Sequence, residues 1–189
     1  MKKYLLSGLA IAGLMMFAGA ASAGNPYTVV EAGYSIGAGD AGDAGIIGIG
    51  GGYVFNEFLR SDIIVSYRKF GDLEFSNTSP DIWSIPVLAN VYGTYPIGHG
   101  FGVYGMAGLG MSFNKTDSDT GVGGKTKSNF AWNVGAGVDY KINRCWTVDL
   151  GYRYSDLGEG RVKADAGYTG KTKEDLRSHD IKLGLRYNF

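Results

Sequence analysis

Eight stretches of this sequence alternate between apolar and polar side chains with a period of two, and nearly all of their charges fall on one parity. In the closing stretch, Ile181, Leu183 and Leu185 alternate with Asp180 and Lys182. A period of two predicts a β-strand, because successive side chains point to opposite faces of a sheet. The stretches span residues 29–38, 46–55, 59–69, 82–95, 101–113, 129–140, 146–155 and 178–189. They predict an all-β chain.

The connections between these stretches alternate in length. Short turns at 56–58, 96–100 and 141–145 follow every second stretch, and longer polar loops at 39–45, 70–80, 114–128 and 156–177 follow the others. Short turns at one end and long loops at the other predict an eight-stranded antiparallel up-and-down β-barrel. Pro86 is the exception within a stretch, because it cannot donate a ladder hydrogen bond, and it predicts a bulge or an edge there.

The charged parity holds five acids and five bases. The interior of an eight-stranded barrel is only just wide enough for side chains to fill it. Buried charges persist when they are paired and hydrogen-bonded, so the balance predicts a salt-bridge network in the lumen. Its predicted members are Glu31, Arg60, Asp62, Arg68, Asp139, Asp149, Arg153, Asp180, Lys182 and Arg186. The opposite parity carries almost no charge.

The apolar parity is expected to face outward. If it faced inward, most of the Trp, Tyr and Phe side chains of eight strands would have to fit inside a small barrel, and its volume does not permit this. A continuous apolar exterior of this extent suits lipid, and aromatic side chains near strand ends are typical of interfacial girdles. The predicted girdles are Tyr53, Phe55, Tyr95, Phe101, Tyr140, Trp146 and Phe189 at the short-turn end, with Tyr67, Trp83, Phe113, Phe130 and Tyr154 at the other.

The N-terminal residues have the pattern of a secretory signal peptide. Lys2 and Lys3 precede an apolar run over 4–17, and Ala21-Ser22-Ala23 offers a small-x-small cleavage site. The apolar run is shorter than the roughly 20 residues of a transmembrane helix. We therefore predict a cleaved segment at 1–23 and a barrel domain at 24–189.

Charge and cysteine content exclude several kinds of protein. Without Lys2 and Lys3 the 18 basic residues fall to 16 against 18 acidic, so the formal charge is about −2 and does not favour a nucleic-acid partner. Cys145 is the single cysteine, so no disulfide framework is expected. A free, reactive or intermolecularly paired Cys145 stays an alternative to an ordinary thiol in a turn.

Three long stretches resemble a known family over essentially the whole predicted mature chain. They are "WSIPVLANVYGTYPIGHGFGVYGMAGLGMSF", "FAWNVGAGVDYKINRCWTVDLGYRYSDLGEG" and "LRSHDIKLGLRYNF", which resemble the opacity-type outer-membrane β-barrel proteins. The most characteristic pieces are Gly-Tyr-Arg-Tyr at 151–154, Ser178-His179 and Leu-Arg-Tyr-x-Phe at 185–189.

The resemblance implies eight strands in the bacterial outer membrane, with short turns in the periplasm and long loops outside the cell. It also implies a terminal signal read by the outer-membrane assembly machinery, formed here by Lys182, Gly184, Tyr187 and Phe189. Family members use their outer loops for adhesion or host contact, and the group is often labelled porin. The loops here match no receptor-binding sequence, so no such site is predicted.

No catalytic, cofactor or metal motif withstands inspection. The stretch "DTGVGGKT" around 124–126 imitates a phosphate loop, but Asp119 replaces its first glycine and no strand-loop-helix unit surrounds it. A calcium loop starting at Asp117 lacks the later ligands, and the glycine-rich 48–55 is not followed by a helix. An enzymatic barrel would need a His-Ser or similar pair, and His179 beside Ser178 is better explained as a hydrogen-bonded rim histidine.

The sequence is therefore compatible with three functions. The first is a monomeric, non-enzymatic barrel in contact with membrane lipid and lipopolysaccharide, acting through its loops in adhesion, host or surface interaction, or envelope integrity. The alternative is a narrow porin for small solutes, because Gly48, Gly50, Gly108, Gly110, Gly135 and Gly137 line part of the interior and leave room there. A soluble binding barrel is third.

Overall fold

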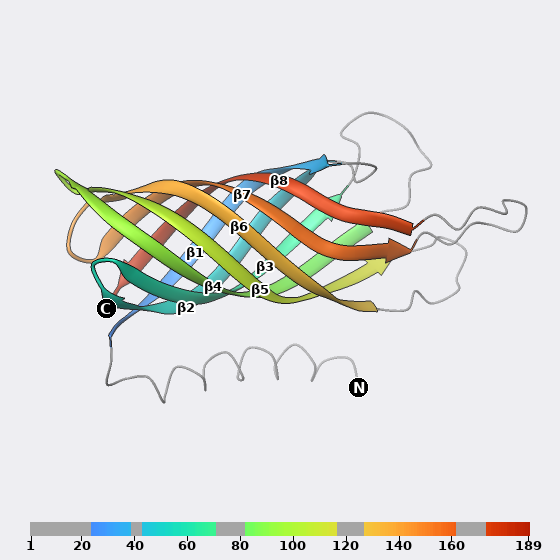
Figure 1. Cartoon of the computed structure of the whole chain (residues 1–189), viewed down its shortest axis with the longest axis horizontal. Coiled ribbons are helices and arrows are strands. Elements are labelled where there is room, and N and C mark those ends of the chain that lie inside the picture. Colours follow the sequence, from blue (N-terminus) through green and yellow to red (C-terminus); the bar gives the residue numbers. More distant parts are fainter. Residues whose placement is uncertain (1–23, 39–42, 71–81, 117–126, 162–172) are drawn as a thin grey trace, which may run out of the picture.

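The computed structural model describes residues 24–38, 43–70, 82–116, 127–161 and 173–189. These residues form eight strands: β1 (Asn25–Ala38), β2 (Ala44–Asn56), β3 (Leu59–Phe70), β4 (Ile82–Gly98), β5 (Phe101–Thr116), β6 (Lys127–Lys141), β7 (Trp146–Arg161) and β8 (Lys173–Asn188). Each strand pairs antiparallel with its neighbours in sequence, and β1 pairs with β8, so the sheet closes into a barrel (Figure 1). The predicted fold class is confirmed.

Short turns gather at one end of the barrel, where the C-terminus also lies (Figure 1). In the turn between β4 and β5, Gly98, His99 and Gly100 have positive φ angles of 100°, 54° and 84°, respectively. Two of these three residues are glycine, which adopts this conformation without a steric cost. The predicted loops at the opposite end fall mostly on 39–42, 71–81, 117–126 and 162–172, outside the described residues.

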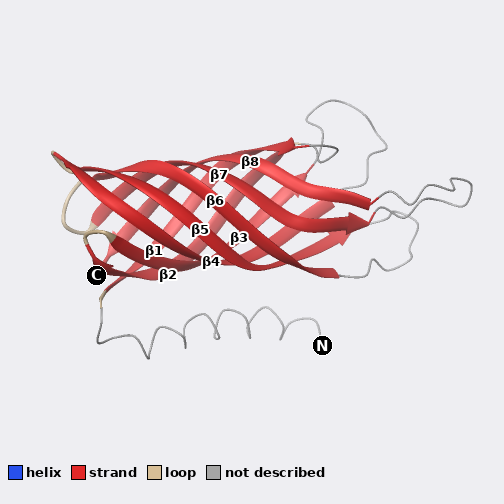
Figure 2. Ribbon diagram, in the orientation of Figure 1, coloured by secondary structure: helices blue, strands red, loops and turns tan. Residues whose placement is uncertain are grey.

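The strands are longer than the sequence pattern predicts. β1 begins at Asn25 instead of residue 29, while β7 continues to Arg161 and β8 begins at Lys173, so the predicted loop at 156–177 is too long. A register shift between Asp156 and Glu159 accommodates Gly158, whose φ is 76°. The strands have 12 to 17 residues, more than the roughly 9–11 that a transmembrane β-strand needs. Figure 2 shows that strands form the whole wall of the barrel.

Pro86 marks neither a bulge nor an edge. It pairs with Ser112 of β5, and the β3–β4 register is the same before and after it, with Val65 opposite Val87 and Arg68 opposite Ser84. Only the pairing with β3 is interrupted at this point. The barrel therefore tolerates the missing N–H by omitting local ladder contacts without shifting the strands.

Candidate functional site

The polar parity of the strands lies inside the barrel. Every predicted member of the lumen network is 5 % or less exposed: Glu31, Arg60, Asp62, Arg68, Asp139, Asp149, Arg153, Asp180, Lys182 and Arg186. Closure of eight strands brings these side chains together from positions far apart in the sequence. They divide into a central network and a group nearer the short turns.

Asp180 is the centre of the central network, which comprises Glu31, Arg68, Arg153, Asp180 and Lys182. Its carboxylate lies 2.9 Å from Nη2 of Arg68 and 3.1 Å from Nε of Arg153. Three hydroxyls also donate to it, from Ser35, Ser155 and Ser178. Asp180 thus has the paired and hydrogen-bonded surroundings that a buried carboxylate requires.

Glu31 carries the second carboxylate of the central network. Its Oε2 lies 2.8 Å from Nζ of Lys182, and its Oε1 lies 3.2 Å from Nη1 of Arg153. The sequence predicts that Glu31 belongs to a lumen charge network, and the structure places two bases beside it. Because Arg153 donates to both Glu31 and Asp180, it joins the two carboxylates into one network.

A second group lies nearer the short turns. Nη2 of Arg186 contacts Asp139 at 2.8 Å, and its Nε lies 3.9 Å from Asp149. Arg60 differs from these pairs: its guanidinium stacks 3.6 Å from the centre of the Tyr92 ring, while Asp62 is 4.0 Å away. Asp62 instead accepts hydrogen bonds from three other side chains, those of Tyr27, Asn90 and Tyr92.

Inward tyrosines are the members of the site that the predicted charge network leaves out. Tyr27, Tyr92 and Tyr104 are buried in the lumen, and Tyr104 contacts Asp149 as well as stacking edge-on to Tyr92. Tyr92 and Tyr104 occupy the inward parity, which is the signal that could have found them. Tyr27 precedes residue 29, where the first predicted strand begins.

An apolar cluster occupies the loop end of the lumen. It consists of Ala44, Leu88, Ala131, Leu157 and Leu176, all 3 % exposed or less. Two of these leucines fall in the predicted loop at 156–177, which the structure shows as strand on both sides. Charged and apolar layers thus succeed each other along the axis of the barrel.

The inward glycines do not leave the lumen open, so that part of the porin argument is wrong. A Cβ at Gly48 would meet Glu31 at 2.8 Å, and one at Gly50 would meet Ile64 at the same distance. Tyr104 lies over Gly137, and Asn90 and Asn133 lie over Gly108. Larger neighbours therefore occupy the space that each glycine vacates.

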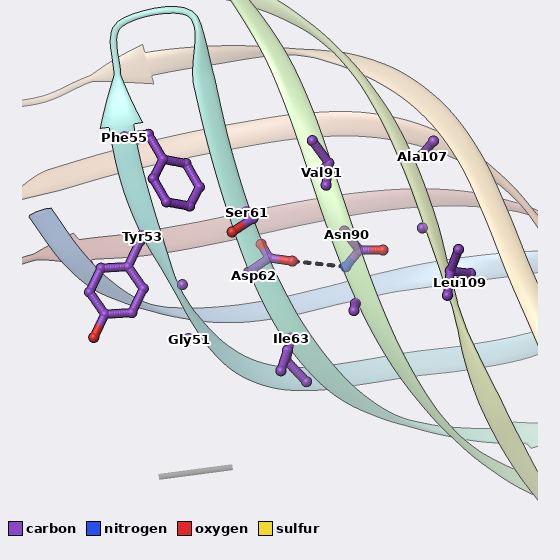
Figure 3. Close-up of a pocket in the computed structure, with 13 residues that line it drawn as sticks. Gly51, Tyr53, Phe55, Ser61, Asp62, Ile63, Asn90, Val91, Ala107 and Leu109 are labelled. Atoms are coloured by element: carbon purple, nitrogen blue, oxygen red, sulfur yellow. Dashed lines mark hydrogen bonds between the residues drawn. The ribbon is translucent and has the colours of Figure 1, made fainter. Parts of the chain in front are cut away.

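The outer wall is apolar and carries the predicted aromatic girdles. Ring pairs lie at both ends, with Phe101–Tyr140 and Trp146–Tyr187 near the short turns and Tyr67–Trp83 and Trp132–Tyr154 toward the loops. Tyr53 departs from its expected exposure, since it is 9 % exposed beside a shallow groove of about 630 Å³ across β2 to β5. Figure 3 shows the residues that line this groove, among them Asp62 and Asn90 with the hydrogen bond between them.

Ser178 and His179 lie on opposite faces of β8. Ser178 donates to Asp180 inside the lumen, whereas Nδ1 of His179 hydrogen-bonds the Tyr152 hydroxyl on the outer wall at 2.5 Å. The adjacent residues therefore do not form a nucleophile–base pair. Across the described ranges, no three His, Cys, Asp or Glu side chains are grouped to hold a metal.

Residues 6–189 match the family model described as an outer membrane protein beta-barrel domain. The chain belongs to the outer-membrane β-barrel family. The predicted resemblance to outer-membrane β-barrel proteins is confirmed, and the protein is located in the outer membrane.

Several curated proteins resemble this outer-membrane barrel in sequence. The 31 kDa outer-membrane immunogenic protein of Brucella melitensis is 33 % identical over 46 % of this chain and 38 % of its own. The 22 kDa outer membrane protein of Rhizobium leguminosarum is 29 % identical, and the putative adhesin RC1281 of Rickettsia conorii is 26 % identical; each match covers 74 % of this chain and 66 % of the relative. The chain thus spans less than two thirds of the length of these relatives.

Solved structures share the fold at low sequence identity. Neisserial surface protein A has a TM-score of 0.66 at 21 % identity, covering 87 % of this chain and 97 % of its own. OprG of Pseudomonas aeruginosa has a TM-score of 0.59 at 13 % identity, covering 88 % of this chain and 96 % of its own.

None of the described residues forms a helix with the length and apolarity needed to cross a bilayer.

Three residues of the predicted assembly signal lie in β8, and the fourth, Phe189, directly follows this strand. Lys182 points inward to Glu31, and Gly184 provides room for Asp149, because a Cβ there would lie 2.7 Å from its oxygens. Tyr187 and Phe189 stack on the outer wall, where Phe189 is 73 % exposed. Their role in assembly stays a prediction.

The remaining sequence features have simple positions in the barrel. Cys145 is an exposed free thiol in the β6–β7 turn. The glycine-rich 48–55 is part of β2. The imitations of a phosphate loop and a calcium loop, like the predicted signal peptide, lie outside the described residues.

Proposed function

We propose that this protein is a non-enzymatic surface-contact barrel that acts through its outer loops. The filled lumen carries this proposal: side chains such as Arg68, Arg153 and Asp180 are 1 % exposed or less, and their charges are paired. A wall of this kind is a rigid support, and outer-membrane barrels present their longer loops outside the cell. Function is then expected at the loop end.

The loop sequences and the relatives support this assignment. The connection that follows β7 has the sequence "VKADAGYTGKT", a largely polar stretch that contains both acids and bases, which suits contact with a hydrated surface. The Rickettsia conorii relative is named a putative adhesin, and the Brucella melitensis relative an immunogenic outer-membrane protein. We accordingly place the contact with host cells, extracellular matrix or lipopolysaccharide in these loops.

The narrow porin is the weaker candidate. Buried tyrosines, ion pairs and the apolar cluster of Leu88, Leu157 and Leu176 occupy successive levels of the lumen. A pore for solutes needs a continuous aqueous path, and large barrels obtain one by having more strands. The packing of the described residues therefore favours a scaffold.

Loop replacement tests the proposed function. Each outer loop is replaced by a short Asn-Gly turn, and the control carries the same loops in scrambled order at full length. Heat-modifiable gel mobility verifies that each variant forms the barrel. We expect the short-loop variant to lose binding to host cells, matrix or lipopolysaccharide. Binding equal to that of the intact protein would exclude the loops as the contact site.

We further propose that export removes residues 1–23 and that the remaining barrel is a monomer inserted by the outer-membrane assembly machinery. The mass of the protein isolated from outer membranes should correspond to residues 24–189. Light scattering in detergent should give one copy for each micelle.

A further inference from the structure

A cavity of about 340 Å³ lies at the short-turn end of the lumen. Its lining contains four bases, Arg60, Lys141, Arg144 and Arg186, against the carboxylates of Glu57 and Asp139. Amide and hydroxyl side chains complete the wall, from Asn25, Asn56, Asn143, Asn188, Thr94 and Thr147. Most of the lining residues therefore carry polar or charged groups, with more bases than acids, and Val54 and Phe189 add apolar surface.

Of the two buried bases in this cavity, Arg60 is less well compensated than Arg186. It is 4 % exposed, and the nearest carboxylate, that of Asp62, is 4.0 Å away. Its Nε and Nη2 donate no hydrogen bond, and Nη1 has only a long 3.5 Å contact with the Tyr27 hydroxyl. The stacked rings of Tyr92 and Tyr104 attract the cation but accept no N–H bond in their plane.

Two further buried polar atoms without a hydrogen-bond partner belong to residues that line the same cavity. They are Nε of Arg186, a residue 4 % exposed, and Oγ1 of Thr94. Asp139 does not neutralise Arg60, because it is already bonded to Nη2 of Arg186 at 2.8 Å. Buried guanidinium nitrogens without acceptors are costly, so an acceptor group from outside the chain fits this end of the lumen.

The chemistry of the lining selects the kind of ligand. Guanidinium groups bind phosphate and carboxylate oxygens through strong charge-assisted hydrogen bonds. Amide side chains such as those of Asn143 and Asn188 can donate to the remaining oxygens. The exposed Lys141 and Arg144 at the mouth would attract an anion toward the interior.

We propose that the short-turn end of the lumen is a binding site for a small oxyanion, a phosphate or carboxylate group, entering from the periplasm. Arg60 and Arg186 hold the anion at the bottom of the cavity, and Lys141 and Arg144 attract it at the mouth. The site is separate from the outer loops, so its existence does not depend on the proposed surface function.

Nuclear magnetic resonance of the refolded barrel tests this site. The protein is held in micelles of a sugar-headgroup detergent, which supplies no phosphate, and is titrated with inorganic phosphate in place of chloride at constant ionic strength. We expect saturable shifts of the Arg60 Nε–H and of the Thr94 and Asn188 amides, with a Kd of about 1 mM.

Three variants separate a site from general charge screening. Arg60→Gln removes the buried cation, and the double variant Lys141→Gln/Arg144→Gln changes only exposed side chains at the mouth, so its folding is not at risk. Both are expected to weaken phosphate binding at least about fivefold. Arg177→Gln removes a base at the opposite rim, where Arg177 pairs with Asp156, and should bind phosphate as the unaltered protein does.

The outcomes are distinct. Absence of saturation in the unaltered protein, or equal weakening in Arg177→Gln and the double variant, would overturn the proposal. A second titration in nanodiscs of phosphatidylglycerol identifies the source of the anion. If the shifts are complete before phosphate is added, the lipid head group fills the site; if phosphate still produces them, a soluble anion does.

Discussion

At the residue scale, Asp180 carries more of the central network than any other side chain. Its carboxylate is bound by two guanidinium groups and three hydroxyls, which come from β1, β3, β7 and β8. Removing one partner from a buried ion pair leaves an uncompensated charge, which costs far more than the pair contributes. Replacing Asp180 therefore tests whether the lumen contains a buried ion-pair network.

Replacement of Asp180 by Ala should destabilise the barrel by about 3–5 kcal/mol, because Arg68 and Arg153 lose their shared carboxylate. Urea unfolding in lipid vesicles measures this difference. The control is Asp156→Ala, whose ion pair with Arg177 is at the partly exposed rim and should matter by about 1 kcal/mol or less. Equal effects at the two positions would contradict a buried network.

Two glycines of β5 make a second prediction at this scale. A Cβ at Gly108 would collide with Asn90 and lie 2.8 Å from Asn133, whereas a Cβ at Gly105 meets nothing within 4 Å. Gly108→Ala should cost about 1–3 kcal/mol by overpacking the lumen. Gly105→Ala should be neutral or stabilising by about 0.5–1 kcal/mol. The same unfolding measurement checks both, and a tolerated Gly108→Ala would mean that the lumen has room.

The individual pairings could not be predicted from the sequence, although their inward positions could. Parity assigns Glu31, Arg153 and Lys182 to one face. The stagger of all eight strands decides that the first of these meets the other two, and no local pattern contains that information. For the same reason the sequence places Arg60 among carboxylates but does not predict that it stacks on Tyr92.

At the element scale, strand ends were the weakest part of the sequence prediction. Residues 156–161 and 173–177 are polar on both parities apart from Leu157 and Leu176, so the alternation disappears where β7 and β8 extend toward the loops. A strand that has passed beyond the hydrocarbon no longer needs an apolar outer face. The two leucines still point inward, because the lumen continues to need filling.

The terminal strand gives a prediction about assembly. Deletion of Phe189 should reduce the amount of barrel recovered in the outer membrane several-fold, while unfolding of the refolded protein should change little. The structural reason is its position: Phe189 is exposed, and its local contacts are a 3.1 Å backbone hydrogen bond to Pro26 and a ring contact with Tyr187.

Phe130→Ala is the matched control, because Phe130 is an aromatic of β6 with 66 % exposure on the same outer wall. It should insert normally. Normal insertion of the Phe189 deletion would remove the basis for an assembly signal, and equal loss in both variants would point to lipid contact in general.

At the scale of the whole molecule, the closed lumen predicts electrical silence. The purified protein should produce no stable conductance steps in planar bilayers, because ion pairs, tyrosines and the apolar cluster around Leu88 occupy successive levels. A sixteen-stranded porin measured in the same bilayer provides the positive control. Reproducible steps from this protein would show that it conducts and would restore the porin as its function.

The cross-lumen bonds of Arg68 and Arg153 also have a consequence for the order of events in folding. Arg68 reaches Asp180 over 112 residues, and Arg153 reaches Glu31 over 122 residues, whereas neighbouring strands pair through local hairpins. These bonds can form only after β1 has paired with β8. They therefore form late in folding and stabilise a barrel that is already closed. Breaking them should accelerate unfolding while leaving the rate of closure nearly unchanged, which gives the barrel its persistence in the membrane.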